Sequence, residues 1–402
     1  MLQNRASLYK IYIKERFFAK VLINSLKKRG AVMKTNSWKK KVSAAVLCGV
    51  LGTTLSVAVQ PVPTASAGGL GNILGTAVQA AAASQQVEAL IKHYDKTEEG
   101  RQELFAAYQK KYGVSENYYR NEQLDAMMPR LTKGIAAVDP TINQKPYLYF
   151  INKQTSFNAF CSMGHVMSVN EGLYSLTEDE NEVAVVLAHE MGHGQKNHVA
   201  SSMRKKLNVA IGAAMVGSAV GGSTLTNLAL NVLVNQIDTV SITKKDEWEA
   251  DNLAFDYVIN AGYNPGAAAA IWQRVEEKYG KSKTSFAGEI FSPSDHPTHQ
   301  QRRENYVKKL FEYSGKHVTA EKGVVKVNGK ALVQPVAAEG KSGAERSYFV
   351  LGNLAAAYHN GHNKSNAYAS GNTLMLGEQP IMACYSGDPS ASELAELLNR
   401  IK

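Results

Sequence analysis

The first 67 residues contain almost no acidic side chains. Glu15 is the only acidic residue there, whereas twelve residues are lysine or arginine, so this segment carries a charge of +11. Because the whole chain has a formal net charge of +10, residues 68–402 carry −1. A nearly neutral body lacks the basic surface that binds a polyanion, and we expect no nucleic-acid partner.

The basic segment has the pattern of an export signal. Three lysines at 39–41 precede an apolar run, and the small residues at 65–67 suit cleavage. We predict a leader over 1–67, with 33–67 as the signal proper because Met33 offers a second start site. The chain is therefore expected in the periplasm or cell envelope of a bacterium, with an uncleaved membrane anchor as the alternative.

Cysteine is scarce: Cys48, Cys161 and Cys384 are the only three. Removal of the leader would leave the last two, which lie far apart in the sequence. We expect them to be separate small apolar side chains rather than a disulfide, although an oxidising compartment would permit pairing.

The apolar run 206–222 is slightly short for a bilayer span, and its small residues recur at near-regular spacing. We expect a buried helix over the functional site, and a peripheral membrane contact is the alternative.

No internal repeat is apparent. We divide the body into a helical segment (68–145), a central domain (146–317) and a C-terminal module (318–402). Short β-branched and aromatic runs predict strands at 147–151 and 158–167. Beyond residue 318, alternating apolar residues around an Asn-Gly pair predict a hairpin, and a small α+β module follows from it.

Residues 189–193 have the sequence His-Glu-Met-Gly-His. We expect them on a helix that begins near Thr177, where Thr177 and Glu180 match a capping box. His189 and His193 then lie about 40° apart around the axis and face one way. Two neutral imidazoles suit Zn²⁺, and Glu190 can reach a metal-bound water as the general base. The pattern predicts a metallopeptidase with one zinc ion per chain and protein or peptide substrates.

A zinc site of this kind needs a third ligand. His198 is nine positions after His189, about 180° round a continuous helix, so we do not expect it to join the histidine pair. Glu247 is the predicted third ligand. Asp251 lies four residues later on the same helix face, and we predict that it accepts the outer N–H of a ligating histidine.

These motifs give the chain a resemblance to the gluzincin family that includes the CAAX prenyl protease, the HtpX membrane protease and periplasmic proteases of outer-membrane quality control. The matching residues are Asn158-Ala159-Phe160 with Gly164-His165, His189 to His193, Glu247 to Asp251, Ala261 to Pro265, His296-Pro297 and Arg302.

The resemblance implies an α+β fold in which a mainly helical zincin domain contains a small mixed sheet. It implies that Asn158, Ala159, Phe160 and Gly164 lie near the edge strand that holds the substrate backbone. It also implies that His296 and Arg302 lie near the metal and take part in catalysis. Neither the transmembrane set of the membrane members nor the tetratricopeptide array of one periplasmic branch is evident in the sequence.

Three functions stay open. The first is a zinc endopeptidase of exported or envelope proteins, acting in quality control. The second is a periplasmic chaperone or interaction protein whose peptidase site is latent and restrained, and the third is a membrane-associated protein with a chance motif. The sequence does not define the oligomeric state.

Overall fold

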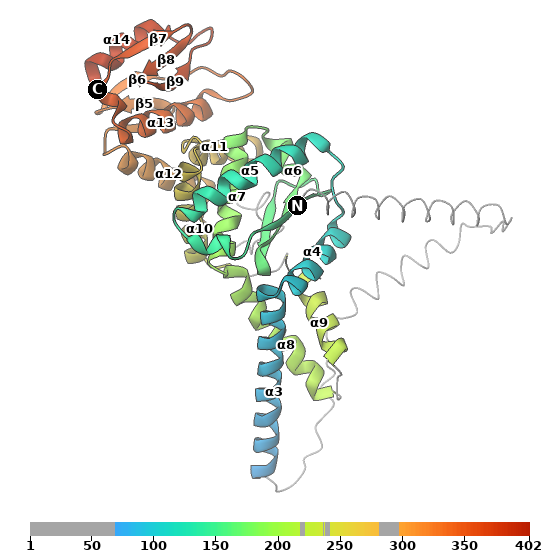
Figure 1. Ribbon diagram of the computed structural model, residues 1–402. Helices are drawn as coiled ribbons and strands as arrows, with labels where there is room; N and C mark the ends of the chain where they lie inside the picture. Colours follow the sequence, from blue (N-terminus) through green and yellow to red (C-terminus); the bar gives the residue numbers. More distant parts are fainter. Residues whose placement is uncertain (1–68, 218–221, 236, 238–241, 281–296) are drawn as a thin grey trace, which may run out of the picture. The chain divides into compact units, whose positions relative to one another are not determined.

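The computed structural model describes residues 69–217, 222–235, 237, 242–280 and 297–402. The predicted leader and His296 lie outside these residues. The described chain is mainly helical with small sheets (Figure 1), which confirms the predicted α+β class.

The N-terminal segment is helical, as predicted. Its helices are α3 (Gly69–Lys96), α4 (Glu98–Tyr112) and α5 (Tyr118–Ala136). Thr97 caps α4, because its hydroxyl oxygen accepts a hydrogen bond from the backbone N–H of Gly100 at 3.0 Å. A short 3₁₀ turn, η1 (Pro140–Asn143), then leads into the central domain.

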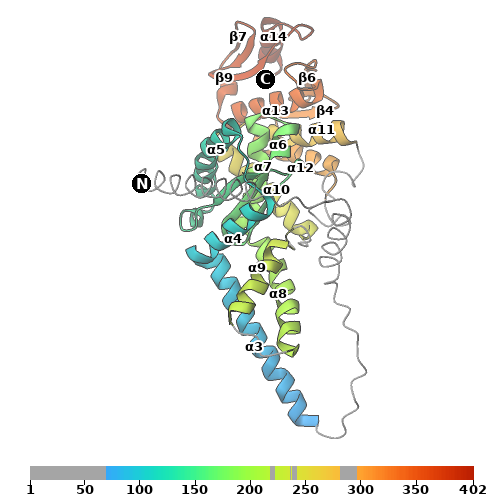
Figure 2. The ribbon, with the colours of Figure 1, turned by 90° about the vertical axis from the view of Figure 1, so that its right-hand side faces the viewer.

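Helix α8 (His198–Gly217) lies beside α3 in both Figure 1 and Figure 2, and α9 (Gly222–Asn235) packs on α8 and α4. Within the predicted helix 206–222, Leu207 and Ile211 are buried in a cluster with α3, α4 and α9, whereas Val209 is 74% exposed. Among the described residues, no helix is long and apolar enough to cross a bilayer.

The central sheet has three strands in the order β1-β3-β2. The strands are β1 (Leu148–Asn152), β2 (Ala159–Ser162) and β3 (Val166–Asn170). β1 pairs with β3 in parallel and β2 pairs with β3 antiparallel, so the sheet is mixed and β2 is an edge strand. The single strand predicted over 158–167 is wrong: a 3₁₀ turn, η2 (Met163–His165), separates β2 from β3.

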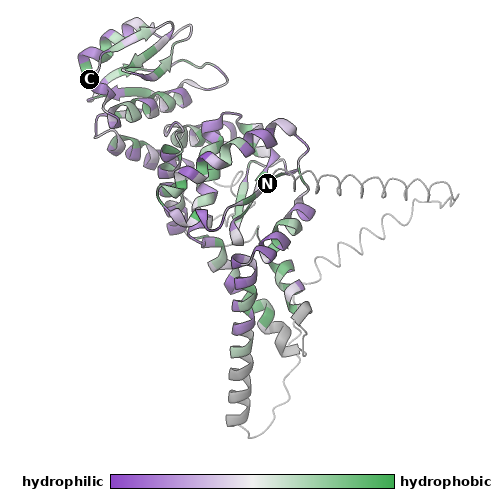
Figure 3. Cartoon of the chain, viewed as in Figure 1, coloured by the Kyte–Doolittle hydropathy of each residue, from purple (hydrophilic) through white to green (hydrophobic). Residues whose placement is uncertain are grey.

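The central helices are α6 (Glu171–Leu176), α7 (Glu180–Gln195), α10 (Lys244–Asn260), α11 (Ala267–Tyr279) and α12 (His299–Tyr313). Among them, α6 and α7 contact this sheet, α10 and α11 pack on α7, and α12 packs on α11. Figure 3 shows α12 as largely hydrophilic, and its buried residues Arg302, Tyr306 and Leu310 recur every four positions. α12 therefore presents one narrow face, which includes Arg302, to the interior.

The predicted capping box at the start of α7 is wrong. The helix begins at Glu180, and its N-cap is Asp179, whose carboxylate accepts from the N–H of Asn181 at 3.0 Å. The Thr177 hydroxyl instead accepts from the Asp179 N–H at 3.0 Å and donates to the carboxylate of the buried Glu182. Asp179 thus caps the helix in place of Thr177, and the Thr177 hydroxyl bonds to the buried Glu182, so the predicted Thr177–Glu180 capping box does not form.

The C-terminal module is built twice from the same unit, so the expectation of no internal repeat is wrong. The first unit contains β4 (Val318–Glu321), β5 (Val324–Val327), β6 (Lys330–Val333) and α13 (Gly343–His359). The second contains η4 (His362–Lys364), β7 (Ala367–Ser370), β8 (Thr373–Leu376), β9 (Gln379–Ala383) and α14 (Ala391–Ile401).

The two units correspond closely in backbone structure. Each forms a three-stranded antiparallel meander with a register shift in its central strand, and a serine in a capping box starts each helix. The helices are shared, because α13 also packs on β9 and α14 also packs on β6. In the first unit, Asn328 and Gly329 have φ of 49° and 79° in the turn of the predicted hairpin, which is confirmed.

The module lies directly against the central helices through α13, which packs on α11 and α12. The approach is very close at Gly266, where a Cβ atom would lie 1.9 Å from the carbonyl oxygen of Tyr348. At Gly352 a Cβ atom would lie 2.0 Å from Oδ1 of Asn264. Glycine at both positions is therefore what allows the two backbones to meet.

Candidate metal centre

Helix α7 carries the His-Glu-Met-Gly-His motif through the interior, and every residue from Leu187 to Gly194 is buried. Its glycines fit close neighbours. A Cβ on Gly192 would lie 3.2 Å from Cα of Ala250 on α10, and one on Gly194 would lie 2.4 Å from the Tyr147 hydroxyl oxygen. The motif helix can thus pack tightly against α10 on one side and the sheet on the other.

This packing brings His189, His193 and Glu247 together. Nε2 of His189 lies 3.1 Å from Nε2 of His193. The Glu247 carboxylate oxygens lie 3.6 Å from Nε2 of His189 and 3.4 Å from Nε2 of His193. Zinc–ligand bonds of about 2.0–2.1 Å in a tetrahedral site place neighbouring donor atoms about 3.3 Å apart, so the two imidazoles and one carboxylate fit zinc.

The outer nitrogen of His189 lies among charged groups. Nδ1 of His189 is 2.9 Å from Oδ1 of Asp251, and Nε of Arg302 donates to Oδ2 of Asp251 at 2.7 Å. The Tyr306 hydroxyl donates to Oδ1 of the same carboxylate at 3.0 Å. The Arg302 guanidinium lies over the Trp272 ring, 4.0 Å from its centroid. Asp251 thus lies against Nδ1 of His189, and Arg302 reaches the centre both through that carboxylate and directly. Its Nη2 lies 3.0 Å from Nδ1 of His189 and 3.6 Å from Oε2 of Glu247.

The electrostatics keep the first histidine neutral. Burial, together with the nearby Arg302 cation, lowers the pKa of His189 to about 4. Burial opposes the charged form of His193 as well, but the Glu247 carboxylate outweighs it and raises the pKa of His193. For Asp251, the Arg302 cation outweighs burial and lowers the carboxyl pKa. A neutral His189 imidazole, with the ionised Asp251 carboxylate facing its outer nitrogen, is the state that binds a metal ion.

Glu190 lies against the edge strand. Its Oε2 accepts a hydrogen bond from the backbone N–H of Cys161 at 3.2 Å. Burial, with the nearby Glu247 carboxylate, raises the pKa of Glu190 to about 7. A carboxylate with this pKa can take and return a proton near neutral pH.

The residues predicted to contact substrate fall into two places. Asn158 immediately precedes β2, and its carbonyl oxygen accepts from the N–H of Asn170 at 2.9 Å. Ala159 and Phe160 lie in the edge strand, where the Phe160 ring packs at 5.2 Å from Tyr108, centroid to centroid. The strand as a whole contacts α7.

Gly164 lies in the turn after the edge strand, with φ of 69°. Its N–H donates to the Asp95 carboxylate at 3.1 Å, and its carbonyl accepts from Nε of Arg101 at 2.6 Å. A Cβ there would lie 2.5 Å from the carbonyl oxygen of Tyr94. The position thus joins the N-terminal helices to the sheet. Cys161, in the edge strand, and Cys384, in the C-terminal module, are both free thiols, so they form no disulfide with each other.

Sequence reasoning missed one contact at the centre. His198 has its Nδ1 only 2.8 Å from Nδ1 of His193. The prediction assumed one continuous helix, but α7 ends at Gln195 and Asn197 has φ of 55°. Asparagine tolerates this left-handed conformation better than most residues, and an Asn two residues after the end of the helix was the available signal.

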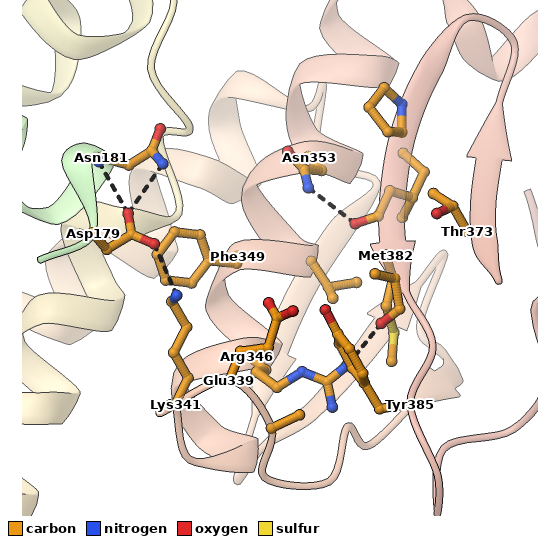
Figure 4. A pocket seen from close by; sticks show the side chains of 15 residues that line it. Asp179, Asn181, Glu339, Lys341, Arg346, Phe349, Asn353, Thr373, Met382 and Tyr385 are labelled. Carbon is orange, nitrogen blue, oxygen red and sulfur yellow. Dashed lines mark hydrogen bonds and ion pairs between the residues drawn. The ribbon is translucent and has the colours of Figure 1, made fainter.

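A separate pocket of ≈ 410 Å³ lies between α7 and the C-terminal module. Figure 4 shows Asp179 bridging Asn181 and Lys341 there, while Asn353 and Arg346 donate to backbone carbonyls of β9. The Lys341 ammonium is 2.8 Å from the Asp179 carboxylate. None of the metal-centre residues lines this pocket.

The folded geometry points to a class of protein, because a helix-borne histidine pair and a carboxylate from a second helix can hold a metal ion beside a buried glutamate, the arrangement expected of a zinc metallopeptidase. Comparison with known families agrees, because residues 119–309 match Peptidase family M48. The matched segment covers just under half of the chain and is similar to the metalloproteases of that family. The predicted class of enzyme and its zinc cofactor are confirmed for this domain.

Several known proteins are similar to part of this chain. Metalloprotease LoiP of Escherichia coli (strain K12) is 28% identical over 180 residues, covering 44% of this chain and 68% of LoiP. A putative beta-barrel assembly-enhancing protease of Vibrio cholerae is 27% identical over 166 residues, covering 40% and 33%. Mitochondrial metalloendopeptidase OMA1 of Schizosaccharomyces pombe is 28% identical over 173 residues, covering 43% and 49%. The chain thus spans only a third to a half of the last two relatives.

Proposed function

We propose that the chain is an exported zinc endopeptidase that hydrolyses peptide bonds of exported or envelope proteins and serves in their quality control. The observation that carries this proposal is the convergence of His189, His193 and Glu247 with their donor atoms 3.1–3.6 Å apart. A buried Glu190 beside this group supports an active site over a latent or structural one, since a structural site gains nothing from a base.

A bound zinc ion supplies Lewis acidity and lowers the pKa of a coordinated water to about 7. His189, His193 and Glu247 would hold the ion. Glu190, oriented by the Cys161 N–H, would take a proton from the attacking water and pass it to the leaving amine. The edge strand β2, from Ala159 onward, would align the substrate backbone beside this carboxylate.

Three residues would complete the machinery. Arg302 would fix the Asp251 carboxylate, and Asp251 would hold the outer N–H of His189 so that Nε2 faces the metal. His296 would lie near the metal, as the resemblance to the HtpX and CAAX prenyl protease family implies.

The proposed location is the bacterial periplasm or cell envelope. It rests on the basic leader 1–67 and on the similarity to LoiP and to the beta-barrel assembly-enhancing protease. Within that setting, the segment 206–222 would provide a peripheral membrane contact, and the exposed Val209 supports an apolar surface there.

The decisive experiment combines metal analysis with cleavage of an unfolded protein such as casein. The purified protein should contain one zinc per chain, and Glu190→Gln should keep the zinc while losing about 10²-fold or more in cleavage rate. Glu180→Gln is the matched control, because Glu180 lies on the same helix but is half-buried at its start, where its carboxylate pairs with Arg130 at 2.7 Å and accepts from the Tyr263 hydroxyl at 3.2 Å. Cleavage by the Glu190→Gln enzyme at the wild-type rate would refute the assigned base.

A further inference from the structure

The two candidate zinc-binding histidines have different outer contacts. Nδ1 of His189 faces the Asp251 carboxylate directly at 2.9 Å. Nδ1 of His193 instead faces a second imidazole, with Nδ1 of His198 at 2.8 Å. On the far side of that ring, Nε2 of His198 lies 3.4 Å from Oε2 of Glu249 and 3.7 Å from Oδ1 of Asp246. This chain of polar groups is buried at its histidines and reaches solvent at its carboxylates.

When Nε2 of His193 binds a metal, only one arrangement of protons satisfies the hydrogen bonds from His193 through His198 to Glu249 and Asp246. A neutral imidazole that coordinates through Nε2 carries its proton on Nδ1, so His193 must donate there. His198 must then accept at its own Nδ1 and carry its proton on Nε2. That proton faces Glu249 and Asp246, which only accept when ionised. Each donor in the chain has an acceptor in front of it.

We propose that His198 is a positioning residue that fixes the tautomer and ring orientation of the zinc ligand His193. The inference rests on the proposed metal centre and adds a residue to it. Glu249 and Asp246 hold His198 in the accepting tautomer, and His198 holds His193. The ligand pair is therefore asymmetric: one histidine is supported by a carboxylate in contact, the other through an intervening neutral ring.

The contact between His193 and His198 depends on the local backbone conformation between α7 and α8. If α7 continued past Gln195, His198 would point about 180° away from His189. The left-handed Asn197, with φ of 55°, ends the helix and starts α8 at His198, which turns the imidazole back toward His193. Asp246 is held at the start of α10 by the capping box with Thr243, whose hydroxyl and N–H both donate to it.

The test measures zinc affinity by competition with a chromogenic chelator, using the full chain with and without metal. His198→Leu removes the acceptor and should weaken zinc binding about 10- to 100-fold. His198→Asn keeps an oxygen near the Nδ1 position and should recover part of that loss. Glu249→Gln, which keeps the shape of the outer acceptor, should give a smaller loss in the same direction.

Val199→Ala is the matched control, since Val199 is the next residue on α8 and is buried but has no part in the chain. It should lower the melting temperature of the metal-free protein and leave zinc affinity unchanged. If His198→Leu behaves like Val199→Ala, or if His198→Leu and His198→Asn bind zinc as the wild type does, the positioning role is wrong. If the wild type itself binds no zinc, the metal centre fails instead. Should His198→Leu not fold, the Asn variant and Glu249→Gln still decide the question.

Discussion

Removing the charge of Asp251 should weaken both the fold and the metal centre. Asp251 and Arg302 form a buried ion pair, with exposed fractions of 0% and 7%. In Asp251→Asn the guanidinium would stay buried without this counter-charge, and breaking such a pair costs about 3–5 kcal/mol of unfolding free energy. His189 would also lose a charged acceptor for its outer N–H, which should weaken zinc binding about 10- to 100-fold.

Urea unfolding with and without zinc separates the two effects. The metal-free variant should lose the full cost of the broken pair. At a fixed free zinc concentration well above the dissociation constants, it should lose about a further 1.4–2.7 kcal/mol of zinc-linked stabilisation. Tyr306→Phe is the control: it removes one hydrogen bond to the same ionised carboxylate but keeps the ion pair, and it should cost about 1.5–3 kcal/mol. An Asp251→Asn protein no less stable than Tyr306→Phe would refute the reasoning.

Three further changes test other parts of the structure. Burial raises the pKa of Asp95, but hydrogen bonds from two lysines outweigh it and lower the pKa to about 2. The Asp95 carboxylate therefore contributes up to roughly 2.5 kcal/mol to the unfolding free energy, complete above pH 4 and lost as the pH falls toward 2. In Asp95→Asn, the urea midpoint should change less with pH over this window. Arg274→Met removes the cation that lies 3.1 Å from both Glu182 and Glu345, and it should lower the unfolding free energy by about 3 kcal/mol or more in calorimetry or urea titration at pH 8. Gly266→Ala forces a methyl group against helix α13 and should cost about 1–3 kcal/mol, and an unchanged melting temperature would show that the helices separate freely.

Much of the candidate site could be predicted because its spacing follows from helix geometry. His189 and His193 share a face by their separation of four, and Glu247 and Asp251 do so for the same reason. The structure brings these four side chains together. That α7 and α10 would pack against each other is a tertiary fact that periodicity does not contain. It was assumed when Glu247 was chosen as the third ligand, and the resemblance to a family agreed with it.

What could not be predicted depends on single backbone positions and on competition between local partners. The helix break at Asn197 requires a left-handed residue that no pattern of apolar side chains reveals. The N-cap of α7 is Asp179 and not the predicted Thr177, because the Thr177 hydroxyl donates to the buried Glu182, and a sequence motif does not show this contact. The contact of His198 with the centre followed from the first of these two features and was missed with it.

The repeat in the C-terminal module escaped notice for a different reason. Its two units agree in strand order, in the place of the register shift and in the pattern of burial, yet Ala320 and Ala369 are among the very few identical residues at matched strand positions. Small sheets tolerate any apolar residue of suitable size at a buried position, so identity is lost while the alternation of buried and exposed positions survives. A comparison of burial patterns would have found the duplication that a comparison of letters did not.

The exchange of helix contacts within the module has a consequence for its ancestry. Because α13 covers a strand of the second unit and α14 covers a strand of the first, either unit alone would expose part of its hydrophobic face. A lone precursor of this kind would bury that face only by associating with an identical partner. The present module is therefore equivalent to a symmetric dimer whose two halves have been fused into one polypeptide, and deleting either half would remove half of a shared interior.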